Sequence, residues 1–240
     1  MRRVIRGDLH RILRKWGFYL WVGFMLFFLI YDTVDGPDNV EEALDTFVNE
    51  LQILFPVMVP IPVYLGVYAD ELKAGTMQAA IGRGISRNRI VLAKFLDAGL
   101  LCALLYGGAY LWIRFRHAIL GLHLSALQQE TAVVTTVCYC LLCVGFLSFA
   151  AIFAYLTWNP AVGLVLLVIL STMSKLGLEW FQQKSKLPFY TMSFQGRIES
   201  TSFCILADEA WLPKLLGALA WITLAVGISM LIMSRKELEL

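Results

Sequence analysis

The strongest constraint on this chain is a series of apolar runs that approach the length needed to cross a bilayer. A transmembrane helix needs about 20 apolar residues for a hydrocarbon core of about 30 Å. Of the 240 residues, 59% are hydrophobic and 16% are charged, and the mean hydropathy is +0.69. The runs predict one all-α membrane domain over residues 1–240, with six transmembrane helices. Their expected bounds are 16–31, 51–69, 95–113, 132–158, 161–178 and 211–233.

The basic residues predict how these spans are oriented, because Lys and Arg near spans are retained on the cytoplasmic side. They cluster in residues 2–15 and in the polar loop 70–94, and Arg235 and Lys236 follow the last span. We therefore expect a multi-pass protein of the inner or plasma membrane, with this loop and both termini in the cytoplasm. Topology accounts for the basic clusters, so nucleic-acid binding is not needed to explain them.

Residues 2–15 combine basic side chains with an apolar stripe. Ile5, Leu9, Ile12 and Leu13 recur at helical spacing, which predicts an amphipathic helix on the inner membrane surface, in contact with lipids. Two interpretations stay open. The segment is either an elbow helix that also touches a partner protein or a basic flank that only sets the topology.

The second predicted span contains Pro56, Pro60 and Pro62. Each proline removes a backbone donor and crowds the preceding turn, so this helix is expected to kink or break. Such a bend is typical either of a hinge or pore-lining helix or of a static packing kink.

A few polar positions near the later spans carry separate expectations. Asp97 is expected to be an interfacial residue rather than part of a proton relay. The cysteines Cys138, Cys140 and Cys143 are predicted to be packing residues, with no metal site. Asn159-Pro160 marks a turn between the fourth and fifth spans. Lys175 and Glu179, four residues apart, lie on one helix face and could pair.

The polar loop 70–94 contains the most specific motif. It consists of Glu71-x-x-x-Gly75-Thr76, then Gly84-x-Ser86-Arg87, then Lys94 at the mouth of the third span. This arrangement resembles the loop between the second and third spans of type-2 ATP-binding-cassette (ABC) permeases. That family includes bacterial subunits for antimicrobial-peptide, lantibiotic and drug export or immunity. The alternative is a solvated basic loop of an unrelated membrane protein.

The resemblance implies that the loop forms a cytoplasmic coupling helix that docks on a separate ATPase. The residues expected to couple the two proteins are Glu71, Gly75, Thr76, Arg83 and Arg87. The chain itself lacks a phosphate-binding loop, since Gly82-Arg-Gly84 is not followed by the required lysine. ATP and Mg are thus expected on the partner, and we expect no catalytic residue, metal or cofactor in this chain.

The function implied is that of the permease subunit of an ABC exporter for a hydrophobic or amphipathic peptide, drug or lipid. One six-span chain lines half a pathway in that family, which implies two ATPase subunits and a second permease copy or a related permease. The alternative is a secondary transporter or membrane anchor without an ATPase. An intramembrane enzyme is disfavoured, because the span interiors hold few charged groups that would mark its site.

Overall fold

The computed structural model describes residues 2–34, 40–74, 77, 81–82, 84–119 and 124–235. Helices are the only regular secondary structure within these ranges, as the sequence predicts. Four of them are long and apolar enough to cross a membrane: α8 (Arg87–Ile119), α9 (Ala126–Thr157), α10 (Pro160–Ser185) and α13 (Leu212–Arg235). The chain therefore has the features of a multi-pass membrane protein.

The predicted count of six spans is only partly matched by these helices. A fifth span results if the bent pair Leu44–Ile53 and Phe55–Leu72 is counted as one. The first predicted span lies within α2 (Trp16–Val34), whose apolar part, Trp16–Phe28, is shorter than the other candidates. Six spans therefore stay a prediction, which depends on whether α2 crosses the membrane.

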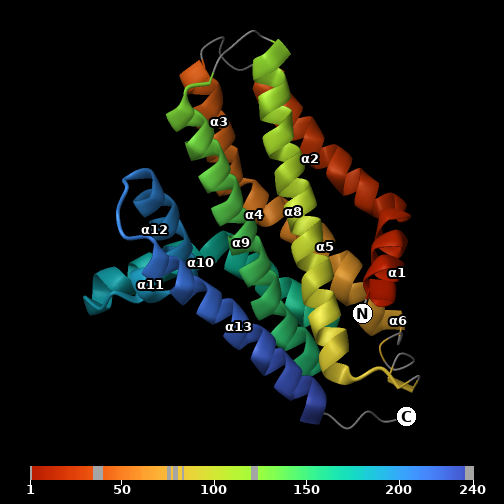
Figure 1. Ribbon diagram of the computed structural model, residues 1–240. Coiled ribbons are helices and arrows are strands. Elements are labelled where there is room, and N and C mark those ends of the chain that lie inside the picture. The colour runs from red at the N-terminus through yellow and green to blue at the C-terminus, as the bar shows by residue number, and fades with distance from the viewer. Residues whose placement is uncertain are drawn as a thin grey trace.

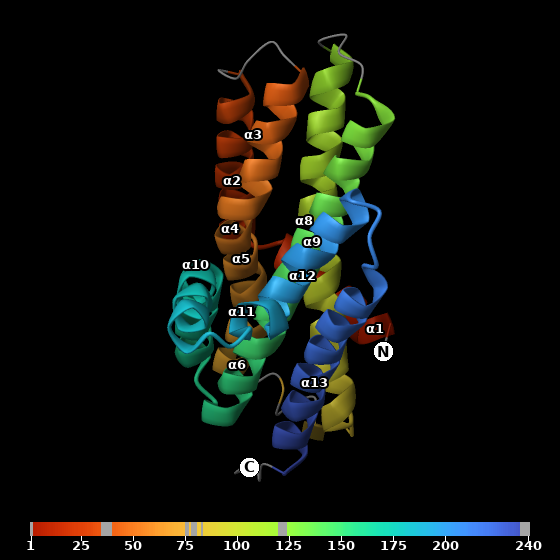
Figure 2. The same ribbon diagram turned by 90° about the vertical axis from the view of Figure 1, so that its left-hand side faces the viewer.

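Two of the helices are longer than the apolar runs from which they were predicted. The third predicted span, 95–113, lies inside α8, and the fourth, 132–158, begins within α9 rather than at its start. A helix can continue beyond the apolar stretch because its backbone hydrogen bonds are satisfied internally. In Figures 1 and 2, α8 and α9 run side by side along the long dimension of the molecule. α3 (Val40–Ile53) starts near the end of α2, and Figure 1 shows the two helices diverging from there.

The second predicted span is a chain of short helical pieces, as its prolines predict. After α3 come α4 (Phe55–Met58), α5 (Pro60–Tyr64), the π-helical turn η1 (Leu65–Ala69) and α6 (Asp70–Ala74). Pro56 and Pro60 occupy the first turns of α4 and α5, where a missing N–H costs little. The axis bends by 40° at Leu54. The predicted kink is confirmed.

The turn between α9 and α10 also lies where the sequence predicts it. Trp158 ends α9 in the left-handed conformation (φ 56°). The side chain of Asn159 then accepts a hydrogen bond from the Ala161 backbone N–H at 2.9 Å, and Pro160 occupies the first turn of α10. The first N–H groups of a helix have no backbone acceptor. The Asn159 side chain provides an acceptor for one of them, and Pro160 has no N–H to satisfy, so the pair suits the start of a helix.

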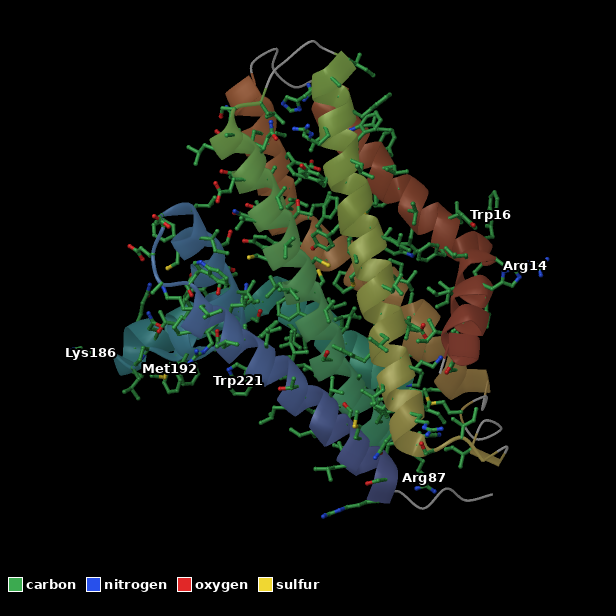
Figure 3. The ribbon with its side chains drawn as sticks, in the orientation of Figure 1. Arg14, Trp16, Arg87, Lys186, Met192 and Trp221 are labelled. Atoms are coloured by element: carbon green, nitrogen blue, oxygen red, sulfur yellow. The ribbon has the colours of Figure 1, made fainter. Side chains whose placement is uncertain are left out.

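The segment between the fifth and sixth predicted spans consists of the end of α10 and two further helices, α11 (Phe189–Met192) and α12 (Phe194–Leu206). Figure 3 shows Lys186 at the far tip of α10 and Met192 nearby on α11, to one side of the bundle. α12 returns to the bundle because the buried Phe194 ring packs edge-on against Phe149, with ring centroids 5.8 Å apart.

One predicted pair in this region is replaced by another. Lys175 pairs with Glu199 of α12, at 2.9 Å between Nζ and Oε2, rather than with Glu179. The two α10 residues share a helix face, but α12 lies close enough to offer Lys175 a carboxylate from another element, which the α10 sequence does not reveal.

Candidate functional site

The N-terminal helix α1 (Arg2–Leu13) presents charged side chains to the bundle. Asp8 and Arg11 are three residues apart, and Lys15, just past the helix end, follows Arg11 by four. This spacing places charged groups on one side of a helix. The same side carries Ile12, which is fully buried. α1 thus contributes both an apolar anchor and a row of ionic groups to its contact with the chain.

Those groups meet residues of α6 and α8 in what we call the charged junction, which comprises Asp8, Arg11, Lys15, Asp70, Glu71 and Lys94. Nη2 of Arg11 lies 2.7 Å from Oε1 of Glu71. Lys94 donates to Asp8 Oδ2 at 2.5 Å and also to the same oxygen of Glu71. Lys15 pairs with Asp70. The junction therefore joins three segments that are far apart in sequence.

Burial divides the junction into an inner and an outer part. The exposed fraction is 2% for Lys94 and 5% for Glu71, whereas the side chains of Lys15 and Asp70 are each 38% exposed. A buried charge is stable only when partners replace its lost hydration. The contact of α6 with α8 therefore depends on the buried ion pair between Lys94 and Glu71.

Asp97 lies one helical turn after Lys94. It is fully buried within the bundle, and neither of its carboxylate oxygens has a hydrogen-bond partner within the described ranges. The apolar sequence around it gives no sign of this, because its burial depends on elements distant in sequence: Asp8 of α1 and Tyr68 of η1 both lie close to it. Its expected place at the membrane interface stays a prediction.

The predicted coupling residues have different positions. Glu71 is buried and pairs with Arg11 and Lys94 within the chain; its contact with a partner stays a prediction. Arg87, at the start of α8, donates to the backbone carbonyls of Met233 at 3.2 Å and Ser234 at 3.3 Å. Gly75, Thr76 and Arg83 lie outside the described residues.

The contact of Arg87 joins two helix ends. Figure 3 shows Arg87 at the base of α8, next to the last turn of α13. The final carbonyls of a helix lack intrahelical partners and carry partial negative charge, so a guanidinium is stabilising there. Both ends of the 70–94 loop are thus bound to the bundle, one through Glu71 and the other through Arg87.

Of the six junction residues, the sequence predicts a functional role only for Glu71. Arg11 and Lys15 enter as part of the basic flank and Lys94 as the end of the loop motif. The available signal was Asp8, the one acidic residue among the basic ones of residues 2–15. An acid in a basic segment indicates a paired cation, although it does not identify Lys94, which is 86 residues away.

The prolines of the second span lie directly before the junction in the chain. The backbone runs from Pro56 and Pro60 through η1 into α6. π-helical turns are rare in proteins, and many of those that occur lie at functional sites. Tyr64 of α5 donates to the backbone carbonyl of Pro160 at 2.9 Å, which ties this broken segment to the α9–α10 turn. A displacement of α6 would therefore reach α1, α8 and the broken segment together.

No protein-family profile matches the sequence, and no curated protein matches it either.

Proposed function

We propose that the chain is the permease subunit of an ABC exporter, driven by a separate ATPase. The 70–94 segment binds that ATPase from the cytoplasm, and both termini lie on the same side of the membrane. Two permease chains and two ATPase subunits form the transporter. It moves a hydrophobic or amphipathic molecule outward, and ATP and Mg bind to the partner alone.

The observation that supports this proposal most is the charged junction behind the loop motif. A loop that receives force has to be attached to the spans, and α6 is attached to α1 and α8 by buried ion pairs. Burial strengthens these electrostatic contacts relative to surface pairs. When the ATPase subunits close on ATP, α6 moves with them, and the junction passes the displacement to α8 and to the broken second span.

The proline breaks supply the compliance that this mechanism needs. A continuous helix resists bending, whereas the segment from α4 to α6 is interrupted at Leu54 and Val59 and contains a π-helical turn. Hinges of this type absorb dihedral changes at a few residues. Movement of α6 thus changes the angle of α3 relative to the bundle. This opens a path between the second span of one chain and the fifth span of the adjacent chain.

The test uses residues at the exposed start of α8, because Glu71 supports the fold as well. Arg89 is exposed, so Arg89→Glu reverses a charge without breaking a buried pair. We expect Arg89→Glu and Arg87→Glu to reduce the amount of ATPase that co-purifies with the full chain by about tenfold, the equivalent of about 1.4 kcal/mol. The measurement is mass spectrometry of the purified complex, with ATP hydrolysis as the second readout.

Arg114→Glu is the matched control, since Arg114 is exposed on the same helix α8 but lies near its other end. It should leave co-purification unchanged. If an ABC ATPase is not recovered with the unaltered chain, or if Arg114→Glu weakens the complex as much as Arg89→Glu, the proposed coupling surface is wrong.

A secondary transporter is the alternative that a specific observation favours. Buried ionisable residues in membrane helices are costly and mark ion pathways in many transporters, and Asp97 is such a residue. Broken helices like α4–α5 also occur in secondary transporters. Transport by the chain alone in proteoliposomes, driven by a proton gradient without ATPase and abolished by Asp97→Asn, would support this alternative over the permease.

A further inference from the structure

A cavity of about 540 Å³ opens beside the bend of the second span. It is bounded by α3, α4, α9, α10 and α12. Its lining combines apolar and polar side chains: Asn49, Gln52, Ile53, Pro56, Val57, Tyr139, Leu142, Phe146, Ser171, Thr172, Lys175, Leu176, Gln195 and Glu199. It is separate from the charged junction, which involves none of these residues.

One wall of the cavity is a finished hydrogen-bond network centred on Glu199 of α12. Its carboxylate accepts from Lys175 at 2.9 Å, from Gln195 at 3.0 Å and from the hydroxyl of Tyr190. Burial and the Glu199 carboxylate both raise the pKa of Tyr190, so the phenol keeps its proton and remains a donor. Glu199 therefore has little capacity left for a ligand.

Lys175 differs from Glu199 in this respect. An ammonium group has three donors, and the structure assigns one of them to Glu199. The side chain is 50% exposed. Two donors of a fixed positive charge thus remain available to acceptor atoms at the cavity.

The opposite wall also presents unused hydrogen-bonding groups. The side chains of Asn49 and Gln52 on α3, and the hydroxyl of Tyr139 on α9, line the cavity. Across the ranges that the structure describes, none of the three makes a side-chain hydrogen bond. Asn49 and Gln52 are exposed and Tyr139 is buried. A polar occupant of the cavity would give all three a hydrogen-bond partner.

The hydroxyls of Ser171 and Thr172 complete the pattern, since both donate to the carbonyl of Val168 on their own helix. The free donors of the cavity are thus those of Lys175, Asn49, Gln52 and Tyr139, together with the second amide hydrogen of Gln195, whose other hydrogen goes to Glu199. Apart from Gln195 and Glu199, the remainder of the lining is apolar, including Val57, Leu142 and Phe146. The charge of Glu199 offsets that of Lys175, but its oxygens already accept three hydrogen bonds. The open groups at this end are therefore mainly donors beside an apolar surface, which matches an amphipathic molecule that carries an anionic oxygen group.

We propose that this cavity binds a small amphipathic anion, with its carboxylate or other oxyanion on Lys175 and its apolar part against Val57, Leu142 and Phe146. Pro56 lines the same cavity, so an occupant contacts the bend of the second span directly. That the bound molecule is the transported one rests on the proposed permease function. Binding itself does not, because it needs no ATPase.

The experiment measures binding of 4-phenylbutyrate to the full chain in phosphatidylcholine nanodiscs by isothermal titration calorimetry. Lys175→Gln should weaken binding at least about tenfold, since a charge-assisted hydrogen bond is lost. Tyr139→Phe removes one hydroxyl and should weaken it about threefold or more. The control is Lys184→Gln, on the same helix α10, whose ammonium lies over the Trp180 ring outside the cavity; its affinity should equal that of the unaltered chain.

Two outcomes overturn the site: no binding of 4-phenylbutyrate by the unaltered chain, or equal affinity in Lys175→Gln, Tyr139→Phe and Lys184→Gln. Tighter binding of the cation 4-phenylbutylamine than of the anion overturns the ligand class. Weaker binding in nanodiscs with phosphatidylglycerol supports the site and identifies a lipid headgroup as a competing source of the anion, whereas unchanged binding supports a free amphipathic anion. Recovery of an ATPase is measured separately, so the site and the permease proposal fail independently.

Discussion

Replacing Lys94 with methionine is expected to destabilise the protein by about 3–5 kcal/mol, the usual cost of removing one partner from a buried ion pair. Lys94 is 2% exposed and donates to both Asp8 and Glu71. Methionine fills a similar volume but leaves Asp8 without its cation, while Arg11 still compensates Glu71. The readout is the thermal unfolding midpoint of the purified chain in detergent, together with the yield of monodisperse protein.

Lys15→Met is the matched control, because Lys15 also joins α1 to α6 but its pair with Asp70 is partly solvated. Such pairs contribute about 0–1 kcal/mol, so the midpoint should change little. Adding Asp8→Asn to Lys94→Met removes the carboxylate that has lost its cation and should recover part of the loss. Equal midpoints for Lys94→Met and Lys15→Met would show that the inner pairs do not hold the junction together.

Replacing Gly163 with alanine is the second change with a large expected effect. A Cβ at this position of α10 would lie 2.1 Å from the Tyr64 hydroxyl oxygen and 2.9 Å from the backbone oxygen of Ala150. Tyr64 is fully buried, so α10 has to move away from both α5 and α9. Overpacking of this type costs about 1–3 kcal/mol, occasionally more, and should lower the unfolding midpoint accordingly.

The double variant Gly163→Ala with Tyr64→Phe gives this prediction its specificity. Removing the hydroxyl eliminates the closest clash, although the contacts with the Ala150 oxygen and Tyr64 Cζ at 2.9 Å remain and the hydrogen bond to Pro160 is lost. The double variant should therefore be destabilised by less than the sum of the two single variants. Gly177→Ala on the same helix is the control, since a Cβ there meets nothing within 4 Å. If Gly177→Ala destabilises as much as Gly163→Ala, the close approach of α10 to Tyr64 is not what limits this position.

Local features of the sequence were sufficient for much of the helical architecture. Apolar runs of the required length predicted four spans that correspond to α8, α9, α10 and α13. Asn159-Pro160 predicted the α9–α10 turn because a cap and a proline act on adjacent backbone groups. The prolines predicted the bend of the second span for the same reason: each removes a donor at its own position.

Partners distant in sequence could not be predicted in this way. Lys94 and Asp8 are 86 residues apart. Lys175 pairs with Glu199, 24 residues away, and not with Glu179 on its own helix. Helical periodicity tells which side chains share a face but not which other element covers that face. For that reason the loop motif predicted a coupling role for Glu71 but not its pairs with Arg11 of α1 and Lys94 of α8.

The amino-acid sequence by itself determined three properties: that the chain has the features of a helical membrane protein, that its second span bends, and where the turn between its fourth and fifth spans lies. Each of these depends on neighbours along the backbone. Only the tertiary structure decided that the charged residues of α1, α6 and α8 form one buried junction, that Asp97 is enclosed, and that a polar cavity opens beside the bend. These depend on how helices pack, and a buried charge is tolerated only where packing brings its partner to it.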